Sequence, residues 1–378
     1  MHISKYRRTG SSSQSERTPA APADDSLAPQ QGSTSQLARR ARPAALVEPG
    51  QRPRVAAMPV LPPEVWRIIA SYIDLQGREG LPAILARHAH YGVKRLFAAA
   101  AGLGGSDVRM IAGHPSYRTV DLSGNRIGRE GAQALAASER FEVLVLRRCE
   151  MGDRAVQAFE HNAAIRRLDV SGNAIGCTGV AALARKRGLS ELDASDNLID
   201  DEGVLALAAS NYLTKLYLRN NFFGDAGALA LASSEMFIEL DLSGNGREGN
   251  DDMEDVDEGI VNLGALMQRF GQNKTIKSLG LGNLAITDQD ISELCPNTSI
   301  TRLGLCGNRI CDRGATALAA HSTIADLDLR DNYIEEEGVM ALLANPRIKS
   351  LDLRNNFLTP TAKAALEAAR PRFEKLLY

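Results

Sequence analysis

One alternation of apolar and polar residues recurs along the C-terminal two thirds of the chain. Copies of it read Val120-Asp-Leu-Ser-Gly-Asn, Leu168-Asp-Val-Ser-Gly-Asn, Leu240-Asp-Leu-Ser-Gly-Asn and Leu327-Asp-Leu-Arg-Asp-Asn. The polar residue that ends the pattern returns every 24 residues in two runs: Asn125, Cys149, Asn173, Asn197, Asn221 and Asn245, then Asn308, Asn332 and Asn356. Apolar residues at every second position predict a short strand with one buried face. The fixed period predicts an array of similar units.

An alanine-rich segment follows most of the predicted strands. It reads Gly-Ala-x-Ala-Leu-Ala at residues 131–136, 227–232 and 314–319, with close variants from Gly179, Gly203 and Gly338. Because alanine and leucine are strong helix formers, each unit is expected to contain a strand, a turn and a short helix. A single unit of this size cannot bury its own apolar face, so the units must stack.

The pattern matches the leucine-rich-repeat signature L-x-x-L-x-L-x-x-N/C-x-L, whose period is 20–29 residues. The sequence therefore predicts an α/β fold, a leucine-rich-repeat solenoid of about ten 24-residue units over residues 114–378. We expect a parallel sheet on the concave side, helices on the convex side, buried leucines, and Asn side chains bonded to turn backbone. An acidic insertion at residues 246–259 separates Asn245 from Leu284, which takes the next Asn position.

Residues 1–58 differ in composition from the rest of the chain. They are rich in Ser, Pro, Gln, Ala and Arg, which predicts a disordered tail. Residues 1–60 contain nine Lys or Arg and four Asp or Glu; since the whole chain carries −2, residues 61–378 carry −7. The sequence contains no apolar run long enough for a membrane span and no secretory signal pattern near residue 1. Its five scattered cysteines favour reduced thiols.

Residues 59–113 predict a small helical unit. A helix is expected within residues 61–73, entered through Pro62 and Pro63, because apolar residues from Val65 to Tyr72 fall on one helical face. Two further helices are expected around Ile84–His90 and Val93–Ala101.

The 24-residue period together with the Gly-Ala-x-Ala-Leu-Ala helix resembles the GALA class of leucine-rich repeats. That class belongs to type III secreted effectors of plant-pathogenic bacteria. The tail, in which five serines precede the first acidic residue, Glu16, also resembles a type III secretion signal. The resemblance implies a virulence protein that is secreted into the host cytoplasm or nucleus.

Proteins of the GALA class carry an F-box before the repeats, and the segment from Leu61 to Ile73 is similar to the opening of an F-box. The resemblance implies that a Skp-type adaptor of a host SCF ubiquitin ligase is bound by Leu61, Pro62, Val65, Trp66, Ile69, Tyr72 and Ile73. The alternative is an N-terminal cap that covers the first repeat, with Trp66 in its core.

The concave face is the second candidate site. The residues that flank the buried leucines are expected to face outward, and those chosen as target-binding are Arg147, Asp169, Asp193, Tyr217, Arg219, Asp241, Asp328, Arg330, Asp352 and Arg354. Asp169 and Asp193 are expected side by side, where a basic ligand segment would relieve their repulsion. The alternative is that these aspartates only follow the repeat consensus.

No catalytic motif, cofactor motif or metal-ligand spacing accompanies the repeats. The sequence therefore predicts no enzyme, no cofactor, no metal, no nucleic-acid or membrane partner, and a monomer. The predicted function is that of a substrate adaptor, which recruits an unknown host protein through its concave face. The alternative is an inhibitor or decoy that binds a target without any role in ubiquitin transfer.

Overall fold

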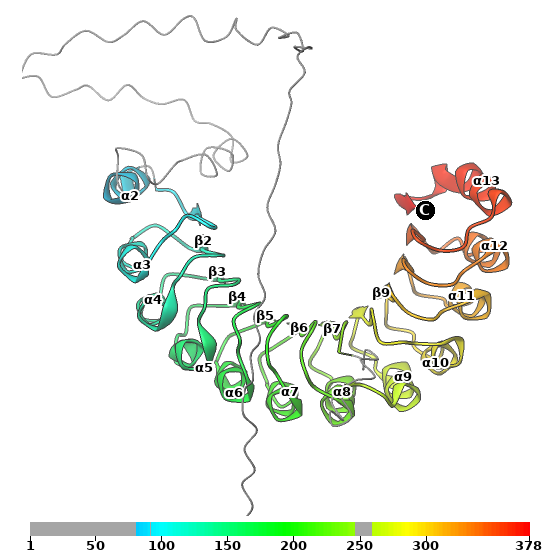
Figure 1. Ribbon diagram of the computed structural model, residues 1–378, viewed down its shortest axis with the longest axis horizontal. Helices are drawn as coiled ribbons and strands as arrows, with labels where there is room; N and C mark the ends of the chain where they lie inside the picture. The colour runs from blue at the N-terminus through cyan, green and yellow to red at the C-terminus, as the bar shows by residue number, and fades with distance from the viewer. Residues whose placement is uncertain (1–80, 91, 246–258) are drawn as a thin grey trace, which may run out of the picture. The chain divides into compact units, whose positions relative to one another are not determined.

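The computed structural model describes residues 81–90, 92–245 and 259–378, all within one compact unit, Leu61–Tyr378. Figure 1 shows its strands along the inner side of an arc and its helices along the outer side. The strands are β1 (Arg95–Phe97), β2 (Thr119–Asp121), β3 (Val143–Val145), β4 (Arg167–Asp169), β5 (Glu191–Asp193), β6 (Lys215–Tyr217), β7 (Glu239–Asp241), β8 (Ser278–Gly280), β9 (Arg302–Gly304), β10 (Asp326–Asp328), β11 (Ser350–Asp352) and β12 (Lys375–Leu377). They form one parallel sheet in sequence order.

Short helices lie on the convex side of this sheet. The α-helices are α2 (Leu81–His90), α3 (Gly105–Ala112), α4 (Gly128–Ala136), α5 (Gly152–Val156), α6 (Cys177–Arg185), α7 (Asp201–Ala208), α8 (Asp225–Ser233), α9 (Leu263–Gln272), α10 (Asp288–Leu294), α11 (Asp312–Ala319), α12 (Glu336–Ala344) and α13 (Pro360–Ala369). Two 3-10 helices are η1 (Gln157–Phe159) and η2 (Arg370–Arg372). The expected solenoid of stacked strand–turn–helix units is confirmed.

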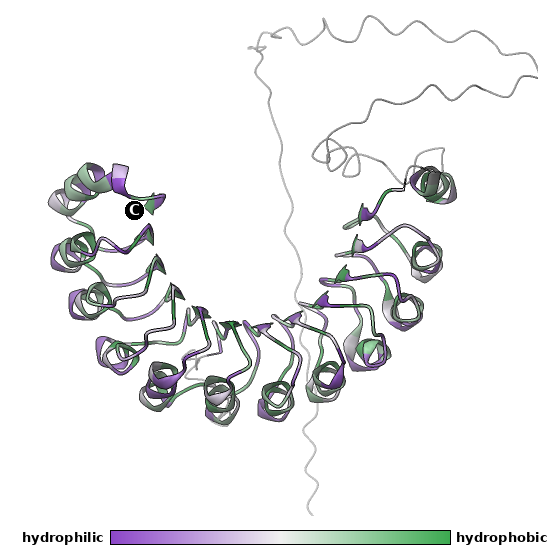
Figure 2. Ribbon diagram, turned by 180° about the vertical axis from the view of Figure 1, so that it is seen from behind, coloured by the Kyte–Doolittle hydropathy of each residue, from purple (hydrophilic) through white to green (hydrophobic). Residues whose placement is uncertain are grey.

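The leucines of successive strands stack into one continuous core. Leu192 pairs in register with Leu216, which in turn pairs with Leu240, and all three are at most 2% exposed. Hydrophobic and hydrophilic residues alternate through every coil (Figure 2), so each coil contributes to the core and to the surface. Burying one such leucine stabilises the fold by about 1.5–3 kcal/mol.

The asparagine side chains of the repeat form hydrogen bonds with backbone groups of the turns, as expected. The Asn173 side-chain nitrogen donates to the carbonyls of Val170 (2.7 Å) and Leu146 (2.8 Å), and its oxygen accepts from the backbone N–H of Cys149 (2.8 Å). Because two of these partners belong to the preceding coil, the asparagine ties neighbouring coils together as well as closing its own turn. In the Asn position of another coil, the Cys149 thiol donates to the Leu122 carbonyl instead (3.3 Å).

A second polar column, which the sequence analysis did not identify, follows the helices. Its members are His114, Ser138, Asn162, Lys186, Ser210, Ser234, Asn273, Asn297, His321 and Asn345. The Asn162 side chain donates to the carbonyl of Ala136 (2.8 Å), the last residue of α4 in the preceding coil, and to that of Ser138 (2.9 Å), two residues beyond it. Asn162 thus bonds backbone carbonyls at a helix end, whereas the buried Ser138 hydroxyl has no hydrogen-bond partner among the described residues.

One expectation for the start of the array was wrong. The segment around Val93–Ala101, expected to be a helix, contains strand β1, in which Leu96 pairs with Val120 and is buried. The sheet therefore begins at Arg95, inside the stretch assigned to the helical unit, and it has twelve strands where about ten units were expected. The helix expected around Ile84–His90 is present as α2. The predicted tail, the F-box-like segment 61–73 and insertion residues 246–258 lie outside the described residues.

Candidate binding face

Three side chains per coil face the concave side of the sheet. They occupy the first and third positions of each strand and the second residue after it, because alternate residues of a strand point to opposite faces. In β5 these positions are Glu191, Asp193 and Ser195, which flank the buried Leu192 and Ala194. The target-binding residues expected from the sequence all fall in the third-position or following column. Whether they bind a target stays a prediction.

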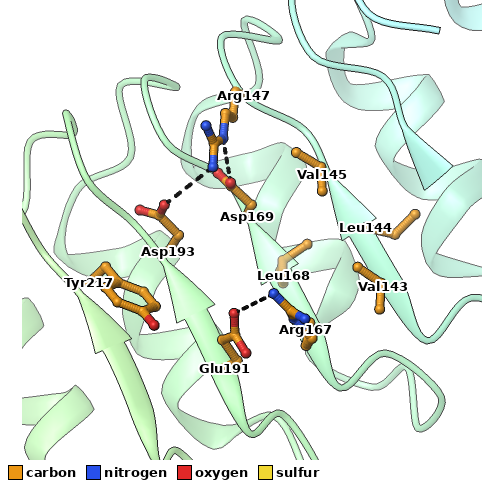
Figure 3. A pocket seen from close by; sticks show the side chains of 10 residues that line it. All are labelled: Val143, Leu144, Val145, Arg147, Arg167, Leu168, Asp169, Glu191, Asp193 and Tyr217. Atoms are coloured by element: carbon orange, nitrogen blue, oxygen red, sulfur yellow. Dashed lines mark hydrogen bonds and ion pairs between the residues drawn. The ribbon is translucent and has the colours of Figure 1, made fainter. Parts of the chain in front are cut away.

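A shallow cavity of about 280 Å³ lies over β3 to β6 on this face. Figure 3 shows its lining residues: Val143, Leu144, Val145, Arg147, Arg167, Leu168, Asp169, Glu191, Asp193 and Tyr217. Val143 and Val145 provide an apolar wall on one side, and Tyr217 lies across the cavity from them. Charged groups line the space between, so the cavity could hold a side chain that is partly apolar and partly polar.

Arg147 forms ion pairs with both aspartates of this cavity. Its Nε donates to Asp169 at 2.5 Å, and its Nη2 lies 3.9 Å from Asp193 (Figure 3). This hydrogen bond to Asp169 raises the pKa of Arg147. Burial, and next the Asp169 charge, raise the pKa of Asp193. Asp169 and Asp193 lie side by side, as expected, and Arg147 supplies one cation to the pair. That a basic ligand segment binds there stays a prediction.

The first-position column carries a ladder of ion pairs that the sequence analysis missed. Arg167 pairs with Glu191 (2.7 Å), Lys215 with Glu239 (2.5 Å) and Arg302 with Asp326 (2.9 Å). Opposite charges at a spacing of 24 residues were the available signal. Since exposed or half-exposed pairs contribute little to stability, we interpret the ladder as fixing side-chain orientation.

Tyr217 is held by this ladder rather than free to rotate. Its hydroxyl donates to Glu239 Oε2 at 2.8 Å, while Lys215 holds the other oxygen of the same carboxylate. Burial and the hydrogen bond to Glu239 raise the pKa of Tyr217, so the phenol remains neutral at physiological pH. The side chain therefore presents a half-buried ring in a fixed orientation between the two cavities of the face.

A second cavity of about 280 Å³ extends over the following strands from Tyr217 toward Lys375. Its floor contains Gly280 and Gly304, where the sheet carries no side chain. On its far side Arg330 binds Asp328 with two nitrogens (2.8 and 2.9 Å), and Arg354 binds Asp352 at 2.7 Å. Arg219 lies 3.9 Å from Asp241 on the near side. The expected residues thus form two groups, one around each cavity, joined by Tyr217.

The described residues offer no evident catalytic or metal site. Among them no three His, Cys, Asp or Glu side chains are grouped so that they could hold a metal ion. The only described cysteine on the expected concave columns, Cys306, has its pKa raised by burial, which favours the thiol over the nucleophilic thiolate. None of the described helices could cross a membrane.

Helix α2 covers the N-terminal end of the array. Leu81 and Leu85 are 8% exposed and belong to the core that runs through the coils. His88 Nδ1 lies 2.6 Å from the Tyr117 hydroxyl, and His114 Nε2 lies 3.1 Å from the Leu85 carbonyl. This helix, expected from the sequence around Ile84–His90, therefore packs as a cap on the first coils.

Comparisons with known proteins identify the repeat and several similar solved structures. The Leucine Rich repeat family matches residues 118–136, 161–184, 209–232 and 320–343. Similar solved structures include an internalin (InlF) of Listeria monocytogenes, 15% identical over 82% of this chain and 93% of that chain, with a TM-score of 0.46. Another is TLR13 in a complex with ssRNA13, 19% identical over 71% of this chain, with a TM-score of 0.45. This chain covers only 36% of that TLR13 chain. No curated protein matches.

The matched repeats and the twelve-stranded parallel sheet define the chain as a leucine-rich-repeat solenoid. Such a fold is typical of non-enzymatic binding scaffolds. It presents an extended surface, here the concave face between β1 and β12, on which most charged side chains of the inner strands have partners within the protein.

Proposed function

We propose that this protein is a non-catalytic adaptor that holds a partner protein against its concave face. The observation that supports the proposal is the preorganised surface around Tyr217, where ion pairs and hydrogen bonds fix the side chains before any ligand arrives. A surface that is already ordered loses less side-chain entropy on binding. Because its charges are balanced internally, we expect shape and hydrogen bonding to determine the choice of partner.

The finer proposal is that the adaptor works in a ubiquitin ligase. It depends on the F-box resemblance of residues 61–73 and on the GALA resemblance of the repeats. Residues Leu61 to Ile73 bind a host Skp-type adaptor, and the concave face holds the host target near the ubiquitin-charged enzyme. Tethering raises the effective concentration of the target without any new chemistry. Delivery into the host cell through a type III system belongs to the same proposal.

Binding to a purified plant Skp adaptor tests the ubiquitin part. We expect a complex at micromolar concentrations that is lost with Trp66→Ala and with Leu61→Ala/Pro62→Ala. Ser195→Ala, on the concave face, is the matched control and should bind like the wild type. Absence of a wild-type complex would reject the adaptor role, and a complex that survives both variants would reject the assigned docking residues.

A photocrosslinking side chain tests the concave face separately. We would place p-benzoylphenylalanine at Tyr217 and, as a control on the convex side, at Met340, which is 48% exposed on α12. With extracts of host cells, one partner should crosslink at position 217 and not at position 340. Equal crosslinking at both positions would contradict a concave binding face.

The second candidate function is an inhibitor or decoy that never meets ubiquitin machinery. The packing of α2 as a cap favours it, because capping alone explains helical sequence before a repeat array. Crosslinking at position 217 without Skp binding would support this candidate over the ubiquitin adaptor.

A further inference from the structure

An apolar surface pair occurs twice on the same edge of the solenoid. The residue after each Asn position of the repeat lies on the loop between strand and helix, and it is polar or small in six described coils: Gly102, Arg126, Glu150, Ala174, Ala285 and Arg309. In the remaining four it is large and apolar, and it is at least half exposed: Leu198 (53%), Phe222 (52%), Tyr333 (50%) and Phe357 (61%). These four form two pairs in adjacent coils.

The two pairs are copies of one local structure. The sequence Asp196-Asn-Leu-Ile-Asp-Asp-Glu-Gly-Val corresponds to Asp331-Asn-Tyr-Ile-Glu-Glu-Glu-Gly-Val, and each is followed one coil later by Arg-Asn-Asn-Phe. The Asn220 side chain donates to Asp196 at 2.8 Å, and the Asn355 side chain donates to Asp331 at 2.7 Å. An equivalent Asn–Asp hydrogen bond therefore joins the two coils of each pair, so both apolar pairs are held in equivalent positions.

The second pair is a preformed aromatic surface. The rings of Tyr333 and Phe357 are stacked with centroids 5.9 Å apart and planes inclined by 23°. Both rings remain exposed on their outer side, so stacking does not remove them from water. Adjacent exposed rings of this kind, rather than scattered single ones, are typical of contact surfaces.

Exposed carboxylates lie within four residues of Leu198 and of Tyr333, at matching positions of the sequence. They are Asp196, Asp200 and Glu202 beside the first, and Asp331, Glu335 and Glu337 beside the second. No ion pair joins any of these six to another residue in the part of the chain that the structure describes. This differs from the concave face, where the aspartates have arginine partners. The excess negative charge at this edge therefore favours a cationic ligand.

We propose that this edge binds a basic segment of a partner protein, in which arginine or lysine alternates with large apolar residues. The apolar side chains of the partner cover the exposed rings, and its cations meet the carboxylates and the ring faces, a favourable arrangement. Five strand spacings separate β5 from β10, about 24 Å along the sheet. An extended chain crosses that span in about eight residues. One segment with two such motifs can therefore occupy both pairs.

A tandem peptide tests the proposal on the full chain. The probe is a fluorescein-labelled peptide in which two copies of GRLRRLRG are joined by a twelve-residue Gly/Ser linker. Its binding is measured by fluorescence anisotropy. Tyr333→Ser/Phe357→Ser and, separately, Leu198→Ser/Phe222→Ser should each weaken binding at least tenfold, because each leaves only one motif engaged. Met340→Ser, which removes an equally exposed apolar side chain from α12 of the same coil, should leave binding unchanged.

Charge and specificity are tested with the same assay. Glu335→Gln/Glu337→Gln should also weaken binding, and a probe with serine in place of leucine should bind at least tenfold less tightly than the leucine probe. Equal binding of both probes, or unchanged binding by the serine variants, would overturn the proposal. So would concentration-dependent dimers that disappear with Tyr333→Ser/Phe357→Ser, since the pair would then serve a second copy of this chain.

Discussion

Lys186 shows how one residue can weaken a repeat at a position where others strengthen it. It is fully buried, and its Nζ contacts the carbonyls of Asn162 (2.5 Å) and Ile165 (2.9 Å) without a carboxylate partner. Burial lowers its pKa from 10.5 to about 8. Asn162 occupies the equivalent position one coil earlier, where its side chain donates to backbone carbonyls and also accepts from backbone N–H groups. Asparagine therefore bonds more backbone groups than lysine does, and it buries no charge.

We predict that Lys186→Asn stabilises the protein at pH 7. The unfolded chain binds the lysine proton up to pH 10.5, whereas the folded chain releases it near pH 8. The unfolding free energy of the wild type therefore gains a contribution as pH rises through this window, on the order of 3 kcal/mol. Urea unfolding of both proteins at pH 7 and pH 10.5 should show the advantage of the variant shrinking. The exposed Lys277→Asn is the control, and its difference in unfolding free energy from the wild type should be the same at both pH values. A difference for Lys186→Asn that is equally constant would contradict the prediction.

The inward and outward positions of one strand should differ sharply in their sensitivity to substitution. Leu192→Ala is expected to lower the unfolding free energy by about 2–5 kcal/mol, because it leaves a cavity between stacked coils. Ser195→Ala should cost about 1 kcal/mol at most, because Ser195, although only 7% exposed, loses a single hydrogen bond to Asp193. Chemical denaturation of the two variants decides the matter, and equal losses would mean that the two faces of β5 are wrongly assigned.

At the scale of the element, the glycine that opens the alanine-rich motif makes room for an aspartate of the preceding coil. Asp201, at the start of α7, accepts from the backbone N–H of Gly224 (3.0 Å) and Gly227 (2.7 Å) at the start of α8. A Cβ on Gly227 would lie 2.7 Å from that carboxylate oxygen and 2.9 Å from Val204. Two later aspartates make equivalent hydrogen bonds: Asp288 accepts from the backbone N–H of Cys311 (2.8 Å), and Asp312 accepts from the backbone N–H of Glu335 (2.7 Å).

Gly227→Ala should therefore destabilise the protein by about 1–3 kcal/mol, through the crowding typical of an overfilled site. Gly264→Ala in α9 is the matched control: its Cβ would meet nothing within 4 Å. There alanine should stabilise by about 0.5–1 kcal/mol, since it restricts the unfolded chain. Melting temperatures that shift in opposite directions would support the assignment, and two stabilising substitutions would contradict it.

The elements that the sequence predicted are those with an intact signature. The leucines and the asparagine column identified most strands, whereas β1 was missed because Ala101 takes its Asn position and only Leu96 and Ala98 mark the strand. The outward columns could be predicted because side chains alternate along a strand. Their ion pairs could not, since the pairing of Arg147 with Asp169 depends on how side chains reach across neighbouring coils.

At the scale of the whole molecule, one junction of the array, between β7 and β8, departs from the 24-residue repeat and is called the seam here. On either side of the insertion, the backbone N–H of Ile260 donates to the Asn245 carbonyl (2.9 Å). In the next coil Leu284 fills the Asn position, buried at 1% but unable to form the amide hydrogen bonds that asparagine makes elsewhere. Neighbour contacts carry the stability of a solenoid, so this junction should be its weakest.

Hydrogen exchange should reveal this seam. Backbone amides of β7 and β8 are expected to exchange faster than those of β4 and β5 at the same temperature, because the coils on either side of the seam separate first. Restoring the column with Leu284→Asn should slow that exchange if the amide regains its partners. Uniform protection across the sheet would argue that the leucine holds the coils together as well as asparagine does.

The strictly sequential pairing of the sheet also has an evolutionary consequence. Each strand bonds only to the strands before and after it in the chain, so a 24-residue coil can be gained or lost without rewiring any other pairing. One such event between β5 and β10 would alter the distance between the two exposed apolar pairs by about 4.8 Å, one strand spacing. Related proteins with different numbers of coils between the two pairs would then select partners whose binding motifs are separated by different distances.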